Sequence, residues 1–370
     1  MQELIIKPDI FRYDRTEDFV REFKIGKGDL ILTYQYIYEP YFKKLNLECD
    51  AAFQENYGSG EPSDVMVETM RKDINKDYRR VIGVRGGTVL DIAKLFALET
   101  GVSLTDLYNG KIQPVKKRKL ILVPMTCGTG SEVTNISILA FHRLETKKGL
   151  ASDALYADTA VLLPQLLGSL PKKVFAASSI DALIHAIESS LSPKANTTTR
   201  MFGYKAIEMI LKGYEKIAEK GDGVRPLLSE QFLLASNYAG IVFGNAGCAA
   251  VHALSYPLGA AYHVAHGESS YALFSGVMKN YLEIKTDGEM QKLKQWISWI
   301  LECRETEAFQ KLDELLGHIM KRKPLHEYGM KEKEIELFTD SVLQNQQRLL
   351  ANNFVELRRD RIMKIYKELF

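Results

Sequence analysis

Cysteine, proline and tryptophan are scarce in this chain, and these shortages exclude several classes of protein. The 370 residues include four cysteines, 11 prolines and two tryptophans. Cys49, Cys127, Cys248 and Cys303 form no CxxC pair, so the sequence predicts free thiols and a reducing compartment rather than a disulfide-stabilised secreted domain. Hydrophobic residues make up 46% of the chain and charged residues 26%, which is typical of a folded globular protein and excludes a disordered or fibrous one.

An excess of charge of one sign is also absent. The 49 basic and 47 acidic residues leave a net charge of +2, which gives no electrostatic reason to expect a nucleic acid or a membrane surface as partner. The one basic cluster, residues 116–119, leads directly into an apolar segment. We interpret it as a solvated turn rather than as a binding patch.

Long apolar runs are missing as well. No stretch approaches the roughly 18 apolar residues of a membrane span. Residues 1–6 lack the basic segment followed by an apolar segment that marks a signal peptide. We therefore expect a cytoplasmic protein that binds neither a membrane nor a nucleic acid.

Strand-like and helix-like segments alternate in the first half of the chain. Short runs rich in Ile, Leu and Val, bounded by turn formers or charges, predict strands at 29–33, 51–53, 80–84, 119–123 and 159–163. Helical patterns at 62–72 and 89–99 lie between them. This rhythm predicts a parallel sheet that is covered by helices on both faces.

The strand signals end near residue 168, which marks the expected domain boundary. For a chain of 370 residues, two domains are the default expectation. Helical periodicity continues to the last residue, with predicted helices at 174–190, 197–220 and 227–243 and several beyond. We expect an α/β domain over 1–168 and an all-α domain, built as a bundle, over 169–370.

Two glycine-rich turns follow predicted strands of the first domain. One strand runs into Gly86–Thr88 and a helix opens at once, so unpaired N–H groups of the helix can face a phosphate. Asp91 and Lys94 share one face of that helix. The loop 124–134 follows the next strand, at the edge where ligands bind in open α/β sheets. An ordinary tight turn is the alternative for the first turn alone, but the two loops together favour phosphate or dinucleotide binding.

A carboxylate and several histidines in the second half form the strongest chemical pattern. Asp181 and His185 are four residues apart in an otherwise apolar helix, so both side chains can reach a common point. His252, His263 and His266 follow in a second segment. One carboxylate with two or three imidazoles suits a divalent first-row ion such as Fe²⁺ or Zn²⁺. Hydrogen-bonded core histidines are the alternative for each position taken singly, but a buried ionised aspartate requires a compensating partner.

Four segments of the sequence resemble the iron-containing (group III) alcohol dehydrogenases. They are GGTVLDIAK at 86–94, PMTCGTGSEVT at 124–134, DALIHAIE at 181–188 and HALSYPLGAAYHVAHG at 252–267, in the family's order. The resemblance implies a Rossmann-like α/β N-terminal domain and an all-α C-terminal domain, the dehydroquinate synthase-like fold. It also implies NAD as cofactor, one divalent metal ion (Fe²⁺, with Zn²⁺ as the alternative) and a homodimer.

The resemblance also implies a role for individual residues. The implied metal ligands are Asp181, His185, His252 and His266. The implied cofactor-binding residues are Gly86, Gly87, Thr88, Asp91, Thr126, Thr129, Thr134, Lys148 and Val174. Around the substrate we expect His263 as a proton shuttle, Phe243 in an apolar wall and Arg348 as the partner of a substrate carboxylate. The alternatives for that partner are His263 and Arg85, and the alternative role of Arg348 is a surface or interdomain ion pair.

Four residues depart from the family pattern. Arg85 replaces the first of three glycines in the phosphate turn, and Met125 replaces a threonine. Tyr34 stands where an aspartate that favours NAD is frequent, so NADP stays open as an alternative. Tyr256 replaces a histidine of alcohol-specific relatives, which leaves the proton route at that position undefined.

The expected reaction is reversible hydride transfer between NAD(H) and a primary alcohol–aldehyde pair, with a metal ion as Lewis acid. By resemblance, the expected small-molecule substrate is a four-carbon ω-hydroxy acid and its aldehyde. One alternative is a family member that acts on an uncharged alcohol or diol. Others are a phosphate-eliminating or glycerol-oxidising enzyme of the same fold and a non-enzymatic metal- and nucleotide-binding protein.

Overall fold

The computed structural model describes residues 2–58, 60–142 and 146–370 and separates into two compact units. The α/β unit comprises Ile6–Thr126 and Gly130–Ser169, and the helical unit comprises Met1–Ile5, Cys127–Thr129 and Leu170–Phe370. The main break, after Ser169, lies next to the boundary expected near residue 168. No sequence pattern indicates that the short segment Cys127–Thr129 packs with the helical unit.

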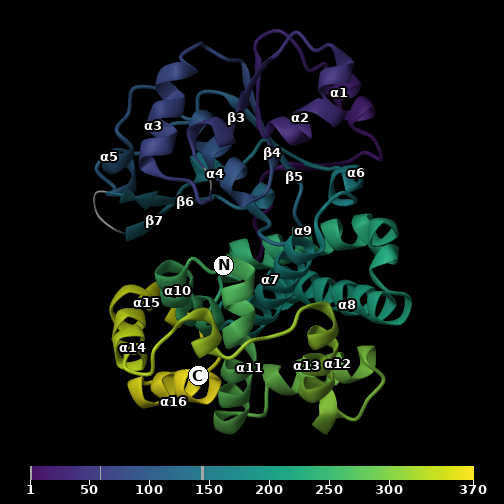
Figure 1. The fold of residues 1–370 in the computed structure, drawn as a ribbon, viewed down its shortest axis with the longest axis vertical. Coiled ribbons are helices and arrows are strands. Elements are labelled where there is room, and N and C mark those ends of the chain that lie inside the picture. The colour runs from purple at the N-terminus through teal and green to yellow at the C-terminus, as the bar shows by residue number, and fades with distance from the viewer. Residues whose placement is uncertain (1, 59, 143–145) are drawn as a thin grey trace. The chain divides into compact units, whose positions relative to one another are not determined.

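A six-stranded parallel sheet forms the centre of the α/β unit (Figure 1). In chain order its strands are β1 (Asp9–Arg12), β2 (Asp29–Thr33), β3 (Asp50–Phe53), β4 (Arg80–Arg85), β5 (Lys119–Pro124) and β8 (Thr159–Leu162). Their order across the sheet is β1-β8-β5-β4-β2-β3, and every neighbouring pair is parallel. The strands predicted from the sequence are confirmed, with a shift of about one residue at some ends.

Both faces of this sheet are covered by helices. Successive residues of a strand point to opposite sides of the sheet, so neighbouring residues join different buried clusters. In β2, Leu30 and Leu32 join one buried cluster and Ile31 joins another. The first cluster includes residues of α3 (Asp64–Asp73), α4 (Gly87–Phe96) and α5 (Leu104–Tyr108), and the second includes residues of α1 (Thr16–Phe23), α2 (Gln35–Tyr41) and α6 (Pro164–Leu167). Burial on both faces explains the continuous apolar runs that predicted the strands.

Close packing between α4 and the sheet depends on one glycine. A Cβ atom at Gly83 of β4 would lie 2.7 Å from the Cβ atom of Ala93 on α4. The backbone of β4 therefore approaches the helix that follows it, which a side chain at this position would prevent. This packing holds the turn at Gly86 at the carboxyl edge of the sheet.

Three of the described strands are not indicated by the sequence. All four residues of β1 are exposed, so this edge strand has no apolar pattern. β6 (Ile136–Phe141) and β7 (Thr146–Ala151) form a separate antiparallel hairpin, with Ile138 opposite Gly149. The hairpin follows the loop 124–134 and lies in the region that the sequence left without a predicted element.

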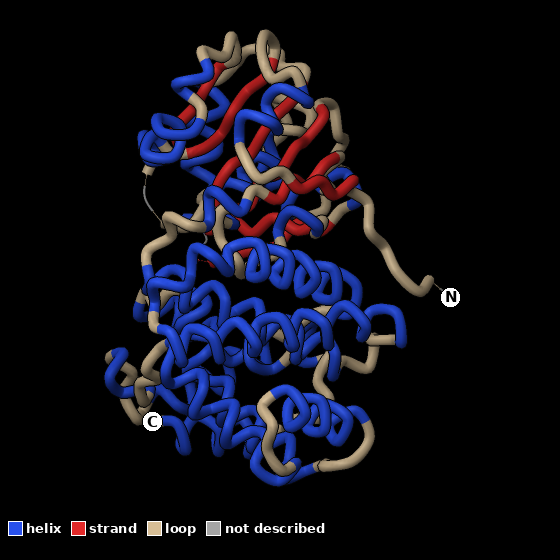
Figure 2. Tube along the Cα trace, turned by 90° about the vertical axis from the view of Figure 1, so that its right-hand side faces the viewer, coloured by secondary structure: helices blue, strands red, loops and turns tan. Residues whose placement is uncertain are grey.

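The helical unit is built around α7 (Lys172–Leu191), which is buried along most of its length. Its most extensive contacts are with α8 (Thr197–Lys220), α9 (Ser229–Ala246) and α11 (His266–Ile284). The other α-helices of the unit are α10 (Ala250–Tyr262), α12 (Glu289–Ile300), α13 (Ala308–Ile319), α14 (Glu334–Asn345), α15 (Gln347–Leu350) and α16 (Arg359–Leu369). Residues 170–370 are all described and contain no strand (Figure 2), so the predicted all-α character is confirmed.

Contrary to the expectation that no segment is apolar enough for a membrane span, α7 is long and apolar enough to cross a membrane when judged by length and composition alone. In the structure, 83% of its most apolar window is buried. The pair Asp222–Ala246 and Ala250–Tyr262 also passes this test, but only as a single span bent by 104°. Core helices of soluble proteins pass the same test, so these segments are weak evidence for a membrane span.

Candidate metal centre and cofactor-binding turn

Four side chains of the helical unit converge on one point. Asp181 and His185 come from adjacent turns of α7, His252 from the first turn of α10 and His266 from the start of α11. One ligand atom from each of the four lies within 4.8 Å of the others. Three helices thus bring together the residues that the sequence singled out as a ligand set.

The spacing of these groups fits a bound cation better than a hydrogen-bond network. Asp181 Oδ1 lies 3.7 Å from both His252 Nε2 and His266 Nε2. Asp181 Oδ2 lies 3.9 Å from His185 Nδ1. These separations are too long for hydrogen bonds, and Asp181 Oδ1 and His252 Nε2 are buried without a hydrogen-bond partner. Ligand atoms around a tetrahedral ion with bonds of about 2.1 Å lie roughly 3.5 Å apart, which is close to the separation of these two orphaned atoms.

Burial and charge act in opposite directions on the Asp181 carboxyl group. Burial by itself raises the pKa of Asp181, whereas the neighbouring imidazoles, that of His266 first, lower it, and the net pKa lies below its usual range. Burial lowers the pKa of His185 to about 3. The site therefore offers an ionised carboxylate and a neutral imidazole, which are the forms that bind a cation.

Two close backbone approaches bring these elements together. A Cβ atom at Gly267 would lie 2.1 Å from the carbonyl oxygen of Ala177, so the start of α11 can approach α7 only with glycine at this position. A Cβ atom at Gly128 would lie 2.7 Å from the carbonyl oxygen of Ser178. The loop around Gly128 is thereby held against α7, and its carbonyl oxygen lies 3.2 Å from His185 Nδ1.

One side of the cluster is open. The side chain of His266 is 40% exposed, whereas Asp181, His185 and His252 are buried. The ring of Phe243 stacks on the ring of His185, with 4.9 Å between the ring centres. The ring centre of Tyr256 lies 6.0 Å from that of His266. Phe243, which the sequence placed in an apolar wall, and Tyr256 therefore lie beside the ligand cluster.

His263 and Arg348, the other residues expected near the substrate, are both exposed. His263 ends α10 in the left-handed backbone region, with a φ of 53°. Arg348 lies on α15, which packs against α10 (Figure 1). Burial raises the pKa of Tyr256 on α10, and the positive charge of Arg348 is among the groups that lower it. The guanidinium of Arg348 is therefore within electrostatic range of the Tyr256 phenol.

The glycine-rich turn of the α/β unit presents the first turn of α4. Gly86 precedes this helix in an extended conformation, and no described side chain caps the N–H groups of the first turn. Such N–H groups bind phosphate in dinucleotide-binding folds. A Cβ atom at Gly86 would lie 3.1 Å from Thr126 Cγ2, so the turn and the loop after β5 lie side by side.

Asp91 and Lys94 belong to a buried network behind this turn. Lys94 is fully buried, and its Nζ lies 2.7 Å from both Ser131 Oγ and the carbonyl oxygen of Ile136. The Asp91 carboxylate accepts hydrogen bonds from Ser131 Oγ at 2.8 Å and from the backbone N–H of Ile138 at 2.9 Å. The network joins α4 to the second glycine-rich loop and to the start of β6, which follows it. The spacing of Asp91 and Lys94 in the sequence indicated that they share one face of the helix, but it did not indicate their hydrogen-bond partners.

The remaining residues implied as cofactor contacts are dispersed. Thr134 is buried in the same network as the two charged groups. Lys148, on β7, donates a hydrogen bond to Asn109 Oδ1 at 2.5 Å. Thr129 and Val174 belong to the helical unit. Within the α/β unit, the structure thus brings together the glycine turn and the loop after β5.

The chain after β2 and β3 carries a carboxylate that the sequence analysis missed. The guanidinium of Arg85 lies over the ring of Tyr34, 3.5 Å from the ring centre. Glu55, which follows β3, accepts a hydrogen bond from the backbone N–H of Gln35 at 2.6 Å, and its Oε2 is buried without a hydrogen-bond partner. Next to Tyr34, which replaces the frequent aspartate, the backbone of Gln35 thus contacts a glutamate from the turn after β3.

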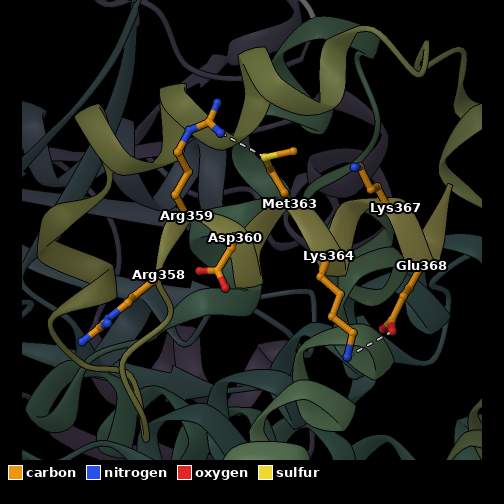
Figure 3. Close-up of a pocket in the computed structure, with 7 residues that line it drawn as sticks. All are labelled: Arg358, Arg359, Asp360, Met363, Lys364, Lys367 and Glu368. Atoms are coloured by element: carbon orange, nitrogen blue, oxygen red, sulfur yellow. Dashed lines mark hydrogen bonds and ion pairs between the residues drawn. The ribbon is translucent and has the colours of Figure 1, made fainter.

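Two surface hollows do not coincide with these sites. One, of about 710 Å³, follows α16 and is lined by Arg358, Arg359, Asp360, Met363, Lys364, Lys367 and Glu368 (Figure 3). Lys364 points toward Glu368 and Arg359 toward Met363 along the same helix. The other, of about 450 Å³, is lined by residues of the α/β unit that include Arg71 and Arg118. Neither hollow includes a residue of the ligand cluster or of the glycine turn.

Comparisons with known proteins cover both units. Residues 11–164 match the family described as iron-containing alcohol dehydrogenase, and residues 175–370 match the Fe-containing alcohol dehydrogenase family, C-terminal. The chain is 51% identical over 371 residues to 4-hydroxybutyrate dehydrogenase of Clostridium kluyveri, with 100% of both chains covered. It is 36% identical over 337 residues to long-chain-alcohol dehydrogenase 1 of Geobacillus thermodenitrificans, which covers 86% of this chain and 83% of the relative.

Solved structures show the same fold. The sulfoacetaldehyde reductase of Bifidobacterium kashiwanohense, in complex with NAD⁺, has a TM-score of 0.85 at 22% identity, covering 100% of this chain and 98% of that chain. The two family matches together span nearly the whole chain and meet near the break between its two units. Because both units agree with one family in sequence and in fold, this chain belongs to the iron-containing alcohol dehydrogenases.

Proposed function

We propose that this chain is an NAD-dependent dehydrogenase that interconverts 4-hydroxybutyrate and succinate semialdehyde with one divalent metal ion, Fe²⁺. The observation that carries the proposal is the ligand cluster of Asp181, His185, His252 and His266, which is open on one side. The substrate pair is supported by 51% identity to 4-hydroxybutyrate dehydrogenase over the full length of both chains.

The four cluster residues would hold the metal. One carboxylate and three imidazoles suit Fe²⁺ and also Zn²⁺, and the orphaned Asp181 Oδ1 and His252 Nε2 require a partner of this kind. When bound, the ion supplies Lewis-acid polarisation of the alcohol or aldehyde oxygen. Phe243 and Tyr256 flank the cluster with aromatic rings, so they orient the carbon chain of the substrate and limit the access of water.

NAD is the cofactor that we propose. The first turn of α4 receives the pyrophosphate through backbone N–H groups, and Gly86 and Gly87 allow the cofactor to approach the backbone. The carboxylate of Glu55 would repel a 2′-phosphate, which favours NAD over NADP. A solved structure of the same fold holds NAD⁺.

We assign the substrate carboxylate to Arg348. This residue lies on α15, against the helix that carries Tyr256, and Tyr256 in turn lies beside His266. The guanidinium is exposed and forms no ion pair with a carboxylate of the described residues. It is therefore available to bind a carboxylate through two parallel hydrogen bonds.

The alcohol proton is exchanged with solvent through His263. This residue is exposed and ends the helix that carries His252, and imidazole can both accept and donate a proton. We further propose a cytoplasmic homodimer that acts on a small molecule. The cysteines of the described residues are free, which is consistent with a reducing compartment, and the dimer rests on the family resemblance alone.

The substrate assignment is tested with Arg348→Ala. We expect KM for succinate semialdehyde to rise by about 10- to 100-fold, because a charge-assisted pair of about 1.5–3 kcal/mol is lost. KM for butanal, which has the same chain length and no carboxylate, should stay nearly unchanged. Arg358→Ala is the matched control, since it removes another exposed arginine, one that pairs with Glu356.

Equal losses on the two aldehydes would contradict this assignment. They would show that Arg348 has a structural role, and they would favour the alternative that the enzyme acts on an uncharged alcohol. If Arg358→Ala raised KM for succinate semialdehyde more than Arg348→Ala does, Arg348 would likewise not be the residue that binds the substrate carboxylate.

The metal assignment is tested with His266→Ala. We expect bound metal and turnover to be lost while the far-UV circular dichroism spectrum is retained, because the other ligand residues belong to an already packed helical unit. Metal content per chain and NADH oxidation by succinate semialdehyde are the measurements. Full metal occupancy with normal turnover would rule out His266 as a ligand.

A further inference from the structure

The carboxylate of Glu188 is buried in the helical unit, just outside the ligand cluster. Glu188 lies on α7, three residues after His185 and seven after Asp181, so the three side chains share one face of the helix. Glu188 is 1% exposed. A carboxylate in such a place needs hydrogen-bond donors around it.

The start of α10 supplies these donors. Glu188 Oε1 accepts a hydrogen bond from the backbone N–H of Val251 at 2.6 Å. Oε2 accepts one from the backbone N–H of Ala249 at 3.1 Å and lies 2.6 Å from His252 Nδ1. The residue that precedes α10 is Ala249, which has no side-chain acceptor, so Glu188 fulfils the capping role from another helix.

The contact with Nδ1 determines which nitrogen of His252 faces the cluster. Both oxygens of Glu188 already accept hydrogen bonds from backbone N–H groups, so the His252 ring is oriented with Nδ1 toward this carboxylate and with Nε2 on the opposite side. Nε2 is the buried atom without a hydrogen-bond partner, 3.7 Å from Asp181 Oδ1. Glu188 thus holds the His252 ring with Nε2 toward the ligand cluster.

Cys248 offers a competing use of the same residues. Glu188, Cys248 and His252 also place one ligand atom each within 4.8 Å of one another and form a second group that could hold a cation. In that group, however, both oxygens of Glu188 already accept hydrogen bonds. The buried atoms without hydrogen-bond partners, Asp181 Oδ1 and His252 Nε2, instead face each other in the cluster of Asp181, His185, His252 and His266.

We propose that Glu188 is a positioning residue that orients His252 and the start of α10 and thereby sets the affinity of the ligand cluster for its cation. This inference rests on the proposed metal site. Replacing the carboxylate that binds the second nitrogen of a ligand histidine typically weakens metal binding by about 10- to 100-fold.

The test uses the full-length protein after metal removal, with Zn²⁺ and Co²⁺ as probes. Zn²⁺ affinity is measured by competition with a chromophoric chelator, and the visible absorption of bound Co²⁺ reports on its coordination. For Glu188→Gln we expect Zn²⁺ affinity to fall by about 10- to 100-fold and the Co²⁺ spectrum to change. The amide replaces one acceptor oxygen with an NH₂ donor that faces other donors. Glu188→Asp keeps the charge and should recover part of the affinity.

Ser189→Ala is the matched control. Ser189 is the next residue of α7, is fully buried and donates a hydrogen bond to the carbonyl oxygen of Gly247 at 3.0 Å. It therefore ties α7 to the same loop as Glu188 without contacting His252. Its loss should lower stability but leave Zn²⁺ affinity and the Co²⁺ spectrum unchanged.

Unchanged Zn²⁺ affinity in Glu188→Gln, or an equal loss in Ser189→Ala, would overturn the inference. A loss in Cys248→Ala as large as in Glu188→Gln would also overturn it, because the cation would then belong to the second group. If Glu188→Gln cannot be purified, Glu188→Asp is compared with Ser189→Ala on the same criteria. Failure of the proposed metal site is recognised separately, because His266→Ala would then keep its metal.

Discussion

Replacing Lys94 with methionine is expected to destabilise the α/β unit by about 3–5 kcal/mol, the usual effect of removing one partner from a buried ion pair. Its ammonium group is fully buried and lies 3.5 Å from Asp91 Oδ1. It also contacts Ser131 Oγ and the carbonyl oxygen of Ile136, each at 2.7 Å. Methionine has a similar shape and no charge, so it would leave the Asp91 carboxylate and the Ile136 carbonyl oxygen without this donor.

Lys111→Met is the comparison that separates burial from distance. Lys111 Nζ lies 3.1 Å from Asp106 Oδ1, which is closer than the Lys94–Asp91 contact, but its side chain is 68% exposed. Solvent screening limits the contribution of such a pair to about 0–1 kcal/mol. If burial rather than distance determines how much an ion pair stabilises the protein, losing the longer but buried Lys94–Asp91 contact should be the more destabilising change.

Hydrogen exchange of the amides in β4 and β5, followed over a series of urea concentrations, measures the stability of the α/β unit. Both tryptophans, Trp296 and Trp299, lie on α12, so their fluorescence reports on the helical unit and serves as an internal reference. Equal losses of stability in Lys94→Met and Lys111→Met would refute the reasoning.

Asp29 is fully buried, and although burial raises its pKa, hydrogen bonds from Arg80 and a backbone N–H hold the net pKa below the usual range. Its contribution to stability is present above the unfolded pKa of about 3.9 and is lost as the pH falls through the lower folded pKa, so the stability of Asp29→Asn against urea should depend less on pH below about 5 than that of the parent protein; an unaltered pH dependence would count against this. Gly267→Ala should weaken Zn²⁺ binding by at least about tenfold, because overpacking moves the backbone and a Cβ atom there would lie 2.1 Å from a carbonyl oxygen of α7. Gly317→Ala on α13, where nothing lies within 4 Å, is its control and should instead gain about 0.5–1 kcal/mol; equal Zn²⁺ affinities in the two variants would disprove the steric argument. Glu55→Gln should shift the ratio of the Kd values for NADPH and NADH several-fold toward NADPH, as measured by cofactor fluorescence; an unchanged ratio would mean that Glu55 only stabilises the start of α2.

The fold was predictable where burial produces a local pattern. The central residues of β2, β4 and β5 are all buried, and this appears in the sequence as uninterrupted runs of apolar residues. β1 is entirely exposed, so only its pairing with β8 in the folded chain defines it as a strand. The placement of Cys127–Thr129 with the helical unit depends on contact with α7, which comes much later in the chain.

The candidate site was predictable to the extent that helical periodicity or a family pattern describes it. Asp181 and His185 follow from their spacing of four residues, whereas their union with His252 and His266 rests on the resemblance to a family. Glu188 shares a helix face with Asp181 and His185, but the first residue that donates a hydrogen bond to it, Ala249, lies 61 residues later in the sequence. Contacts of this range arise from tertiary packing, which local spacing does not encode.

Neither unit of this enzyme is one continuous stretch of polypeptide, and this has a consequence for exchanging parts between relatives. The polypeptide passes from one unit to the other four times, after Ile5, Thr126, Thr129 and Ser169. A fragment cut after Ser169 would carry Gly128 away and leave His185 Nδ1 without the carbonyl oxygen that lies beside it. A chimaera that joins residues 1–169 of one relative to the remainder of another would therefore also exchange the backbone contact of His185, so these two halves are not independent modules.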